Sequence, residues 1–186
     1  MPSKTERLAA DPVNCVDLWG LTASDSKNSL AEIRNGIATP LGESWDELAN
    51  VTSPWGKRDS FVTGNGVTSS GHKGMDFGAP QGTRVNSIKA GTVTTVETDP
   101  DNKRGYGLYT EITHENGTHS FYAHQSKIIV EEGQHVETGE KIGEVGSTGL
   151  STGNHLHFGY DGNGDGIYSD TEWVDNPATL LFSGEE

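Results

Sequence analysis

Short hydrophobic runs separated by polar turn residues dominate the chain between Val51 and Val145. Val, Ile, Thr and Tyr are enriched in these runs, and Gly and Asn separate them, which is typical of β-strands. The predicted strands lie in TRVNSIKAGTVTTVET, GLYTEITHE, THSFYAH, SKIIVEE and EKIGEVG. The tetrapeptide His114-Glu115-Asn116-Gly117 ends in Asn-Gly, which favours a tight hairpin. Many short strands with no long helix between them predict a mainly β fold, an antiparallel sheet or small open barrel.

The pattern differs in residues 1–50, where two short helices are predicted. Ser29-Leu-Ala-Glu32 and Ser44-Trp-Asp-Glu47 both have the spacing of a capping box, in which Ser and Glu satisfy backbone N–H groups at a helix start. Gly36 is placed to end the first helix. Helices this short are unstable alone, so we expect the segment to pack on the main domain or on another protein. The predicted organisation is an N-terminal extension, 1–50, followed by a β domain, 51–186.

Composition and charge exclude several classes of protein. The 186 residues include 25 Gly, a level that suits tight turns between strands. With 13 Lys and Arg against 27 Asp and Glu, the formal net charge is −14, which argues against binding to nucleic acid or to an anionic membrane. No stretch is long and apolar enough to span a membrane, and the N-terminus lacks the apolar segment of a signal peptide. A single Cys excludes an intramolecular disulfide and a multi-cysteine zinc site.

Two short motifs indicate a metal site. His72 and Asp76 are four residues apart, and His155 and His157 are two apart, so in extended strands each pair lies on one face. Two His and one Asp suit zinc, and three protein ligands leave a fourth position open for water, as in catalytic zinc sites. No helical H-E-x-x-H motif is present. The alternative for any single His is an ordinary surface or core residue.

The sequence around these motifs resembles a known family. GHKGMDFGAPQGTRV and YAHQSKIIVEEGQHVETGEKIGEVGSTGLSTGNHLHFGY are similar to the lysostaphin-like (LytM-type) zinc endopeptidases that cut peptidoglycan peptides. The resemblance runs from about Ser53 to His157 and resumes at WVDNPATLL. It implies that His72, Asp76 and His157 bind zinc, because these positions match the zinc-binding residues of the HxxxD and HxH motifs. It implies that the His of YAH and the first His of HxH, His124 and His155, act in catalysis.

Zinc chemistry gives these residues their roles. Bound zinc lowers the pKa of water from about 15.7 towards about 7 and polarises the scissile carbonyl. A histidine with a pKa near about 6.5 can take a proton from that water and pass it to the leaving amine. We expect His155 to be this base, because it lies two residues from a ligand on the same strand face. His124 then steadies the oxyanion or the base.

Other histidines and aromatic residues carry weaker signals. His114, His119 and His135 have polar neighbours in hairpin or turn contexts, so we expect them at the surface. Five aromatic residues near the motifs either line a substrate cleft or pack within the sheet. These are Trp55, Tyr106, Tyr109, Tyr122 and Phe158.

The segment from Asp161 to Glu172 departs from the family pattern. It matches the calcium-loop motif D-x-[DN]-x-[DN]-G-x5-E, and no Lys or Arg follows Lys141. The predicted calcium ligands are Asp161, Asn163, Asp165, the carbonyl of Ile167, a water held by Ser169, and Glu172. The alternative is an acidic, glycine-rich turn without an ion.

The sequence favours a zinc endopeptidase that acts on the cell wall, outside the cytoplasm. With no signal peptide and an extra N-terminal segment, the chain would suit a phage tail or baseplate, with residues 1–50 contacting its proteins. The competing hypothesis is a non-catalytic wall-binding or structural β module of a virion or contractile device. A lipoyl- or biotin-carrier domain is disfavoured, because no lysine at a hairpin tip is found. The bond cut, in a Gly-Gly cross-bridge or between D-Ala and diaminopimelate, stays open.

Overall fold

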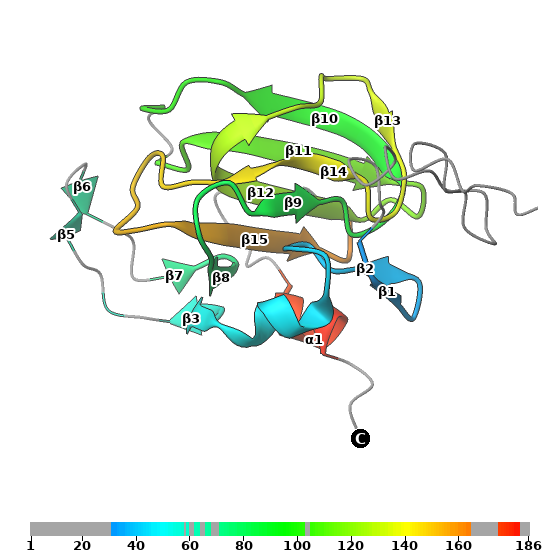
Figure 1. The fold of residues 1–186 in the computed structure, drawn as a ribbon, viewed down its shortest axis with the longest axis horizontal. Coiled ribbons are helices and arrows are strands. Elements are labelled where there is room, and N and C mark those ends of the chain that lie inside the picture. The colour runs from blue at the N-terminus through cyan, green and yellow to red at the C-terminus, as the bar shows by residue number, and fades with distance from the viewer. Residues whose placement is uncertain are drawn as a thin grey trace, which may run out of the picture.

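The computed structural model describes residues 31–57, 59, 62–63, 66–67, 71–102, 105–164 and 175–182, and over these residues the chain is mainly β, as the sequence predicts (Figure 1). The main sheet comprises β3 (Val51–Ser53), β8 (Met75–Gly78), β9 (Arg84–Asn86), β10 (Gly91–Glu97), β11 (Leu108–His114), β12 (His119–Ile128), β13 (His135–Val136), β14 (Lys141–Val145) and β15 (His155–Asp161). Three separate two-stranded pairs are β1 (Ile33–Arg34) with β2 (Ile37–Ala38), β4 (Gly56–Lys57) with β7 (Gly71–His72), and β5 (Val62–Thr63) with β6 (Gly66–Val67). The one α-helix among the described residues is α1 (Pro177–Leu181).

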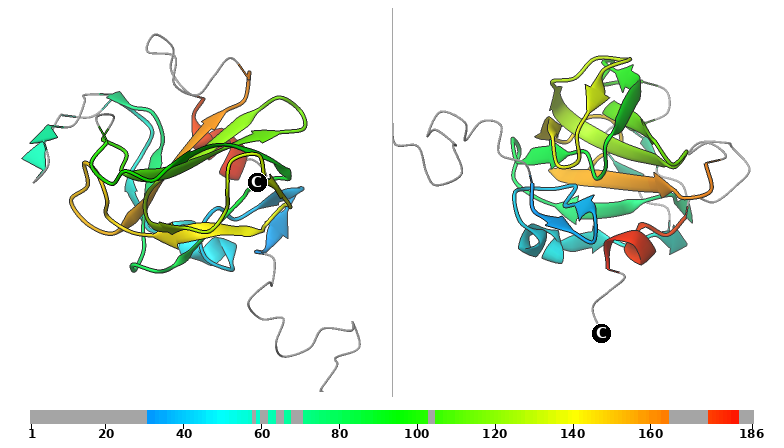
Figure 2. Two further views of the ribbon diagram at one scale, coloured as in Figure 1. Left: turned by 90° about the horizontal axis from the view of Figure 1, so that it is seen from above. Right: turned by 90° about the vertical axis from the view of Figure 1, so that its right-hand side faces the viewer.

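The main sheet follows the order β13-β10-β11-β12-β15-β8-β3, and all its pairs are antiparallel. The strand β12 has β11 on one edge and two partners on the other. β15 pairs with His119–Ala123 of β12, and β14 pairs with its second half from Gln125 to Ile128. β9 then pairs with β14. Seen from above, the sheet is strongly curved (Figure 2).

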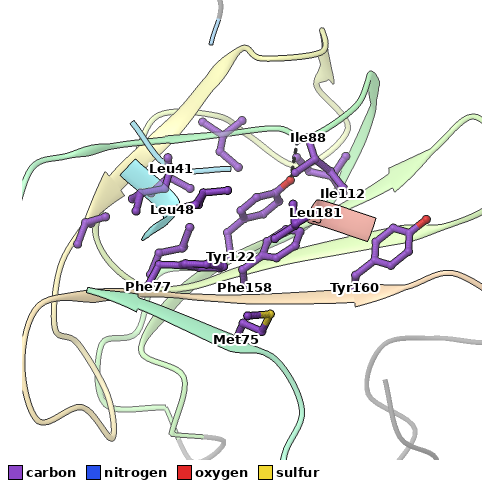
Figure 3. Packing of buried hydrophobic residues seen from close by; sticks show 14 of the residues in the cluster. Leu41, Leu48, Met75, Phe77, Ile88, Ile112, Tyr122, Phe158, Tyr160 and Leu181 are labelled. Atoms are coloured by element: carbon purple, nitrogen blue, oxygen red, sulfur yellow. Dashed lines mark hydrogen bonds between the residues drawn. The ribbon is translucent and has the colours of Figure 1, made fainter. Parts of the chain in front are cut away.

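Alternation along the strands gives the sheet two unlike faces. On β15, Leu156, Phe158 and Tyr160 belong to the main hydrophobic core, so His155 and His157 project from the opposite face. Tyr122 of β12 packs beside Phe158, and its buried hydroxyl accepts a hydrogen bond from the N–H of Ile88 at 2.9 Å (Figure 3). The core therefore fixes the direction in which the histidines of β15 point.

Residues 31–50 pack on this core, but the first predicted helix is wrong where the structure describes it. The strands β1 and β2 form a hairpin around Asn35 and Gly36, whose φ values of 52° and 76° suit a two-residue turn with both central residues left-handed. The Asn-Gly signal outweighs the capping-box spacing here. The second predicted helix is confirmed as a 3-10 helix, Trp45–Ala49, with the complete capping box of Ser44 and Glu47. This helix and α1 lie on the same side of β15 (Figures 1 and 2).

Long-range pairing also changes two strand predictions. The run 83–98 contains two strands, β9 and β10, and the runs 118–124 and 126–132 share one continuous strand, β12. The predicted hairpin at 114–117 is confirmed between β11 and β12. No helix among the described residues is long and apolar enough to cross a membrane.

His114 is buried, and the expectation that it lies at the surface is wrong. Its Nδ1 lies 3.0 Å from the Ala90 carbonyl oxygen and its Nε2 lies 2.9 Å from Ser120 Oγ. Burial lowers the pKa of His114 to about 4. Both ring nitrogens have neutral partners, so the uncharged ring is fully satisfied. His119 is half-buried, and His135 is exposed as expected.

Candidate metal centre and active site

Three side chains from three strands converge on one buried point. His72 ends β7, Asp76 lies in β8 and His157 lies in β15. The strands β8 and β15 are antiparallel neighbours, and Asp76 and His157 are directly opposite in register. The exposed fractions of His72, Asp76 and His157 are 2%, 8% and 4%. The structure thus brings together the three residues that the sequence singles out.

The polar atoms of this cluster face one another. His72 Nε2 lies 3.0 Å from Asp76 Oδ1 and 3.1 Å from His157 Nδ1. His157 Nδ1 lies 2.9 Å from Asp76 Oδ1. All three candidate ligand atoms lie within 4.8 Å of one another. One small ion can therefore reach all three.

The hydrogen bonds around His72 indicate that the atoms facing one another in the cluster suit a cation. His72 Nδ1 lies 2.7 Å from the carbonyl oxygen of Pro54, which can only accept, so Nδ1 carries the proton and Nε2 of the neutral ring has a lone pair. An ionised Asp76 is also an acceptor, and two acceptor atoms 3.0 Å apart need a proton or a cation between them. Two imidazoles and one carboxylate form a ligand set of catalytic zinc sites, with one position open for water.

The protonation states of Asp76 and His157 suit this use. Burial raises the pKa of Asp76, but the adjacent His157 and His72 rings outweigh this effect and hold the pKa well below its usual range. Burial lowers the pKa of His157, so its ring is neutral. An ionised carboxylate and a neutral imidazole are the forms that bind metal. His157 Nε2 is buried and has no hydrogen-bond partner among the described residues.

Gly74 allows the chain to pass close to His157. A Cβ atom at this position would lie 2.8 Å from His157 Nε2 and 2.5 Å from the Phe158 carbonyl oxygen. Both distances are shorter than real Cβ contacts, so any side chain at Gly74 would displace His157 or the backbone of β15. The motif His72-Lys-Gly-Met-Asp76 therefore needs its glycine for close packing.

His124 and His155 lie beside the cluster, each held through Nδ1 by a backbone carbonyl. His155 Nδ1 lies 2.8 Å from the Gly153 oxygen, and His124 Nδ1 lies 2.7 Å from the Thr148 oxygen. Because the carbonyls accept, each neutral ring keeps its lone pair on Nε2. His155 Nε2 lies 3.7 Å from Asp76 Oδ1, and the His124 and His155 ring centroids are 4.6 Å apart. Burial, with smaller effects from His155 and His157, lowers the pKa of His124 to about 3.

A β-bulge turns His124 towards the cluster. Leu108 pairs with Gln125 and Thr110 pairs with Tyr122, so two steps along β11 match three along β12. His124 has a φ of 59°, a left-handed conformation that costs a non-glycine residue about 1–2 kcal/mol. Bulges of this kind redirect side chains next to active sites.

Aromatic rings cover one side of the cluster. Tyr106 lies 5.4 Å from His157 and 5.0 Å from Phe121 between ring centroids. Tyr109, Phe121 and Ala123 form a second, smaller apolar cluster on this face. Of the five aromatic residues with two possible roles, Tyr106 and Tyr109 lie on the site face, whereas Tyr122, Phe158 and Trp55 lie in or against the main core.

The residues that hold His124 and His155 in place were not predicted from the sequence. Ser151 Oγ lies 3.3 Å from His155 Nδ1 and 2.8 Å from Ser147 Oγ. The Thr148 carbonyl accepts from His124. The available signal was the Ser-, Thr- and Gly-rich run from Ser147 to Gly153, directly before the HxH motif.

The predicted calcium loop is described only at its start. Asp161 ends β15 and is 3% exposed. Its Oδ1 accepts hydrogen bonds from the N–H groups of Asn163 at 3.2 Å and Gly164 at 2.9 Å. The other predicted ligands, Asp165, Ile167, Ser169 and Glu172, lie outside the described residues.

Known proteins share this sequence and fold. DD-carboxypeptidase/endopeptidase Mpg of Neisseria meningitidis serogroup B is 45% identical over 108 residues, 58% of this chain and 23% of the relative. The catalytic domain of the antimicrobial peptidase lysostaphin from Staphylococcus simulans superposes with a TM-score of 0.61 at 28% identity, covering 75% of this chain and 98% of the domain. A zinc containing peptidase from Vibrio cholerae gives a TM-score of 0.52 at 34% identity, covering 70% of this chain and 36% of that one. The chain spans between about a quarter and about half of the length of the curated relatives it matches.

The mainly β fold with a buried His-Asp-His donor set defines a metallopeptidase-type protein. The sequence profile of Peptidase family M23 matches residues 70–168, which include His72, Asp76, His124, His155 and His157. The chain belongs to peptidase family M23.

Proposed function

We propose that this protein is a zinc-dependent endopeptidase that hydrolyses peptide bonds in peptidoglycan. The observation that carries the proposal is the buried cluster of His72, Asp76 and His157, with His124 and His155 beside it. Membership of family M23 and the peptidase names of the relatives support it. The substrate is a proposal, since the chain spans only part of those curated relatives.

His72 Nε2, Asp76 Oδ1 and His157 Nδ1 would hold the zinc ion. Bound zinc supplies a Lewis acid for the scissile carbonyl and lowers the pKa of water to about 7. The Pro54 carbonyl keeps the His72 lone pair directed at the cluster. The main core fixes β15, and with it the orientation of His157.

His155 is the proposed general base. Its Nδ1–H is held by Gly153, so Nε2 is the atom that accepts a proton from the attacking water and returns it to the leaving amine. The same atom, His155 Nε2, lies 3.7 Å from Asp76 Oδ1 and therefore faces the cluster. His124, with Nδ1–H held by Thr148, likewise presents a lone pair on Nε2. A lone pair cannot donate to an oxyanion, so in place of the role expected from the sequence we propose that His124 steadies the water.

The test is mass spectrometry of fragments released from two cell-wall preparations, one with Gly-Gly cross-bridges and one with D-Ala–diaminopimelate bridges. Zinc-loaded protein is expected to release new peptide termini from at least one wall, and a chelator should stop the release. The control variant is His135→Ala, because His135 is exposed and is not part of the cluster. Intact peptides from both walls would contradict the proposed function.

A non-catalytic wall-binding or structural module of a virion or contractile device is the alternative, with residues 1–50 contacting phage tail or baseplate proteins. It predicts that the protein sediments with both walls and leaves every peptide intact. The four site histidines and the Asp76 carboxylate would then have no use. The same two preparations therefore separate the alternative from the enzyme.

We also propose that the segment from Asp161 to Glu172 binds calcium and stabilises the end of β15. Support comes from the motif and from Asp161, whose Oδ1 already organises the first turn of the loop. At one hundred times the Kd, calcium would add about 2.7 kcal/mol to the free energy of unfolding. For a chain of this size that corresponds to a rise of about 5–10 °C in Tm. A Tm unmoved by several millimolar calcium, or equally raised in the Asp161→Ala, Glu172→Ala variant, would reduce the segment to an acidic turn.

A further inference from the structure

Thr148 occupies an unusual position between two strands of the sheet. Its Oγ1 donates to the carbonyl oxygen of Gln125 at 2.9 Å and accepts from the N–H of Leu108 at 3.0 Å. Leu108 and Gln125 are register partners of β11 and β12 at one side of the bulge. The hydroxyl therefore bridges two backbone groups, one from each strand, where the regular pairing shifts.

The same residue also holds the bulged histidine. The Thr148 carbonyl oxygen accepts from His124 Nδ1 at 2.7 Å. The backbone N–H of His124 donates to the carbonyl oxygen of Tyr106 at 2.9 Å, so the strained residue is held from both its ring and its backbone. The side chain of Thr148 therefore binds the two strands at the bulge, and its backbone carbonyl binds the ring of His124.

Close packing leaves Thr148 little freedom to move. A Cβ at Gly107 would clash with Thr148 Oγ1, and a Cβ at Gly149 would clash with the Gly105 carbonyl oxygen. The N–H of Leu150 donates to the same Gly105 oxygen at 2.7 Å. The loops around Gly105–Gly107 and Thr148–Leu150 therefore form one packed unit next to His124.

We propose that Thr148 is the positioning residue for His124: its hydroxyl holds the bulge of β12 in place, and its carbonyl keeps the proton of His124 on Nδ1. Nε2 of His124 then faces the metal centre as an acceptor. The proposal rests on the proposed function for the role of His124 in hydrolysis. The position and tautomer of the ring are independent of that function.

The experiment compares Thr148→Val, which removes the hydroxyl at nearly constant volume, with Thr148→Ser, which keeps it. Zinc content is measured first and is expected to be unchanged. The hydrogen bonds of Thr148 go to His124, Gln125 and Leu108, and none of these is a proposed zinc ligand. On wall peptides, Thr148→Val is expected to lower kcat by about 10–100-fold with KM unchanged, because a small misplacement of a catalytic group has effects of this size. Thr148→Ser should restore kcat. The matched control is Thr138→Val, which removes a half-buried hydroxyl that accepts from Ala90 in a remote turn.

Nitrogen-15 spectra of the imidazole rings give a readout that needs no substrate. In the wild type and Thr148→Ser, His124 should be the Nδ1–H tautomer, and in Thr148→Val a mixture with the Nε2–H form is expected. His155, held by Gly153, is the internal control and should not change. If Thr148→Val does not fold, Thr148→Ala replaces it with the same expectation.

An unchanged His124 tautomer together with wild-type kcat in Thr148→Val would overturn the proposal. So would an equal loss of kcat in Thr148→Ser or in Thr138→Val. If the wild type itself cleaves neither wall, the proposed function fails, whereas the spectra still decide whether Thr148 holds His124.

Discussion

The two faces of the sheet each bury a histidine, and they treat it differently. His114 lies on the core side, where the Ala90 carbonyl and the Ser120 hydroxyl satisfy both ring nitrogens of a neutral ring. His157 lies on the opposite face, where Nδ1 meets a carboxylate and a second imidazole and Nε2 has no partner among the described residues. Burying polar groups without full satisfaction is costly, so such an arrangement persists where it has a use. Burial alone does not distinguish the two histidines, but their partners do.

The largest effect is expected for His157→Ala. Removing one of three ligands should abolish stoichiometric zinc binding and peptide release together, since the remaining two residues cannot hold the ion in a fixed geometry. Metal analysis of the purified variant and fragment release measure the two losses. Full zinc retention would show that the ligand set is wrong, and His135→Ala should behave as the wild type.

A smaller but still large effect is expected for His155→Ala. If His155 is a base and not a ligand, zinc should remain at wild-type stoichiometry while kcat falls by about 100–10,000-fold. Zinc content and kcat of the same preparation are compared. Wild-type turnover would remove His155 from the mechanism, and loss of zinc would make it a ligand.

On the core face, the buried His114 should make the free energy of unfolding depend on pH. The folded pKa of His114, about 4, lies below the ordinary value of 6.5, so the unfolded state takes up the proton first as the pH falls. The stabilising contribution is complete above about pH 6.5 and is lost as the pH falls through 4, by about 3 kcal/mol in all. His114→Gln should therefore lose less stability between pH 7 and pH 4 than the wild type in urea unfolding. Parallel pH profiles for the two proteins would contradict this.

The smallest effect is expected for Tyr122→Phe. The ring and its packing on Phe158 remain, but the buried N–H of Ile88 loses its acceptor. The expected cost is about 1–3 kcal/mol in the free energy of unfolding, with zinc content and kcat of the folded fraction unchanged. A loss of kcat would mean that the two faces are coupled more closely than the strand alternation indicates.

The sequence predicts what depends on local spacing. Alternation within β15 predicts that His155 and His157 share a face, and the structure agrees. The expectation that His72 and Asp76 lie on one extended strand is wrong, because β7 ends at His72 and β8 begins at Met75, yet the two side chains still meet in the cluster. The strands β11 and β14 also follow from their β-branched runs.

Features that depend on distant parts of the chain are not predictable in this way. The bulge at His124 arises from pairing with β11 and from Thr148, 24 residues away, which no local pattern encodes. His114 has polar neighbours in sequence, yet Ala90 lies 24 residues before it and helps to bury it. The Asn35-Gly36 pair is a local signal for the hairpin between β1 and β2, but the capping-box spacing of Ser29 and Glu32 pointed to a helix instead.

The place of β15 in the sheet has a consequence for the order in which the protein is made. β15 inserts between β12 and β8, and its His157 meets an Asp76 that lies 81 residues earlier in the chain. At a synthesis rate of about 5–20 residues per second, roughly 4–16 s separate the two residues on the ribosome. During this interval β8 lacks one of its two neighbours, and an unpaired strand edge can associate with other chains. The cluster of His72, Asp76 and His157 therefore cannot assemble before β15 has left the ribosome.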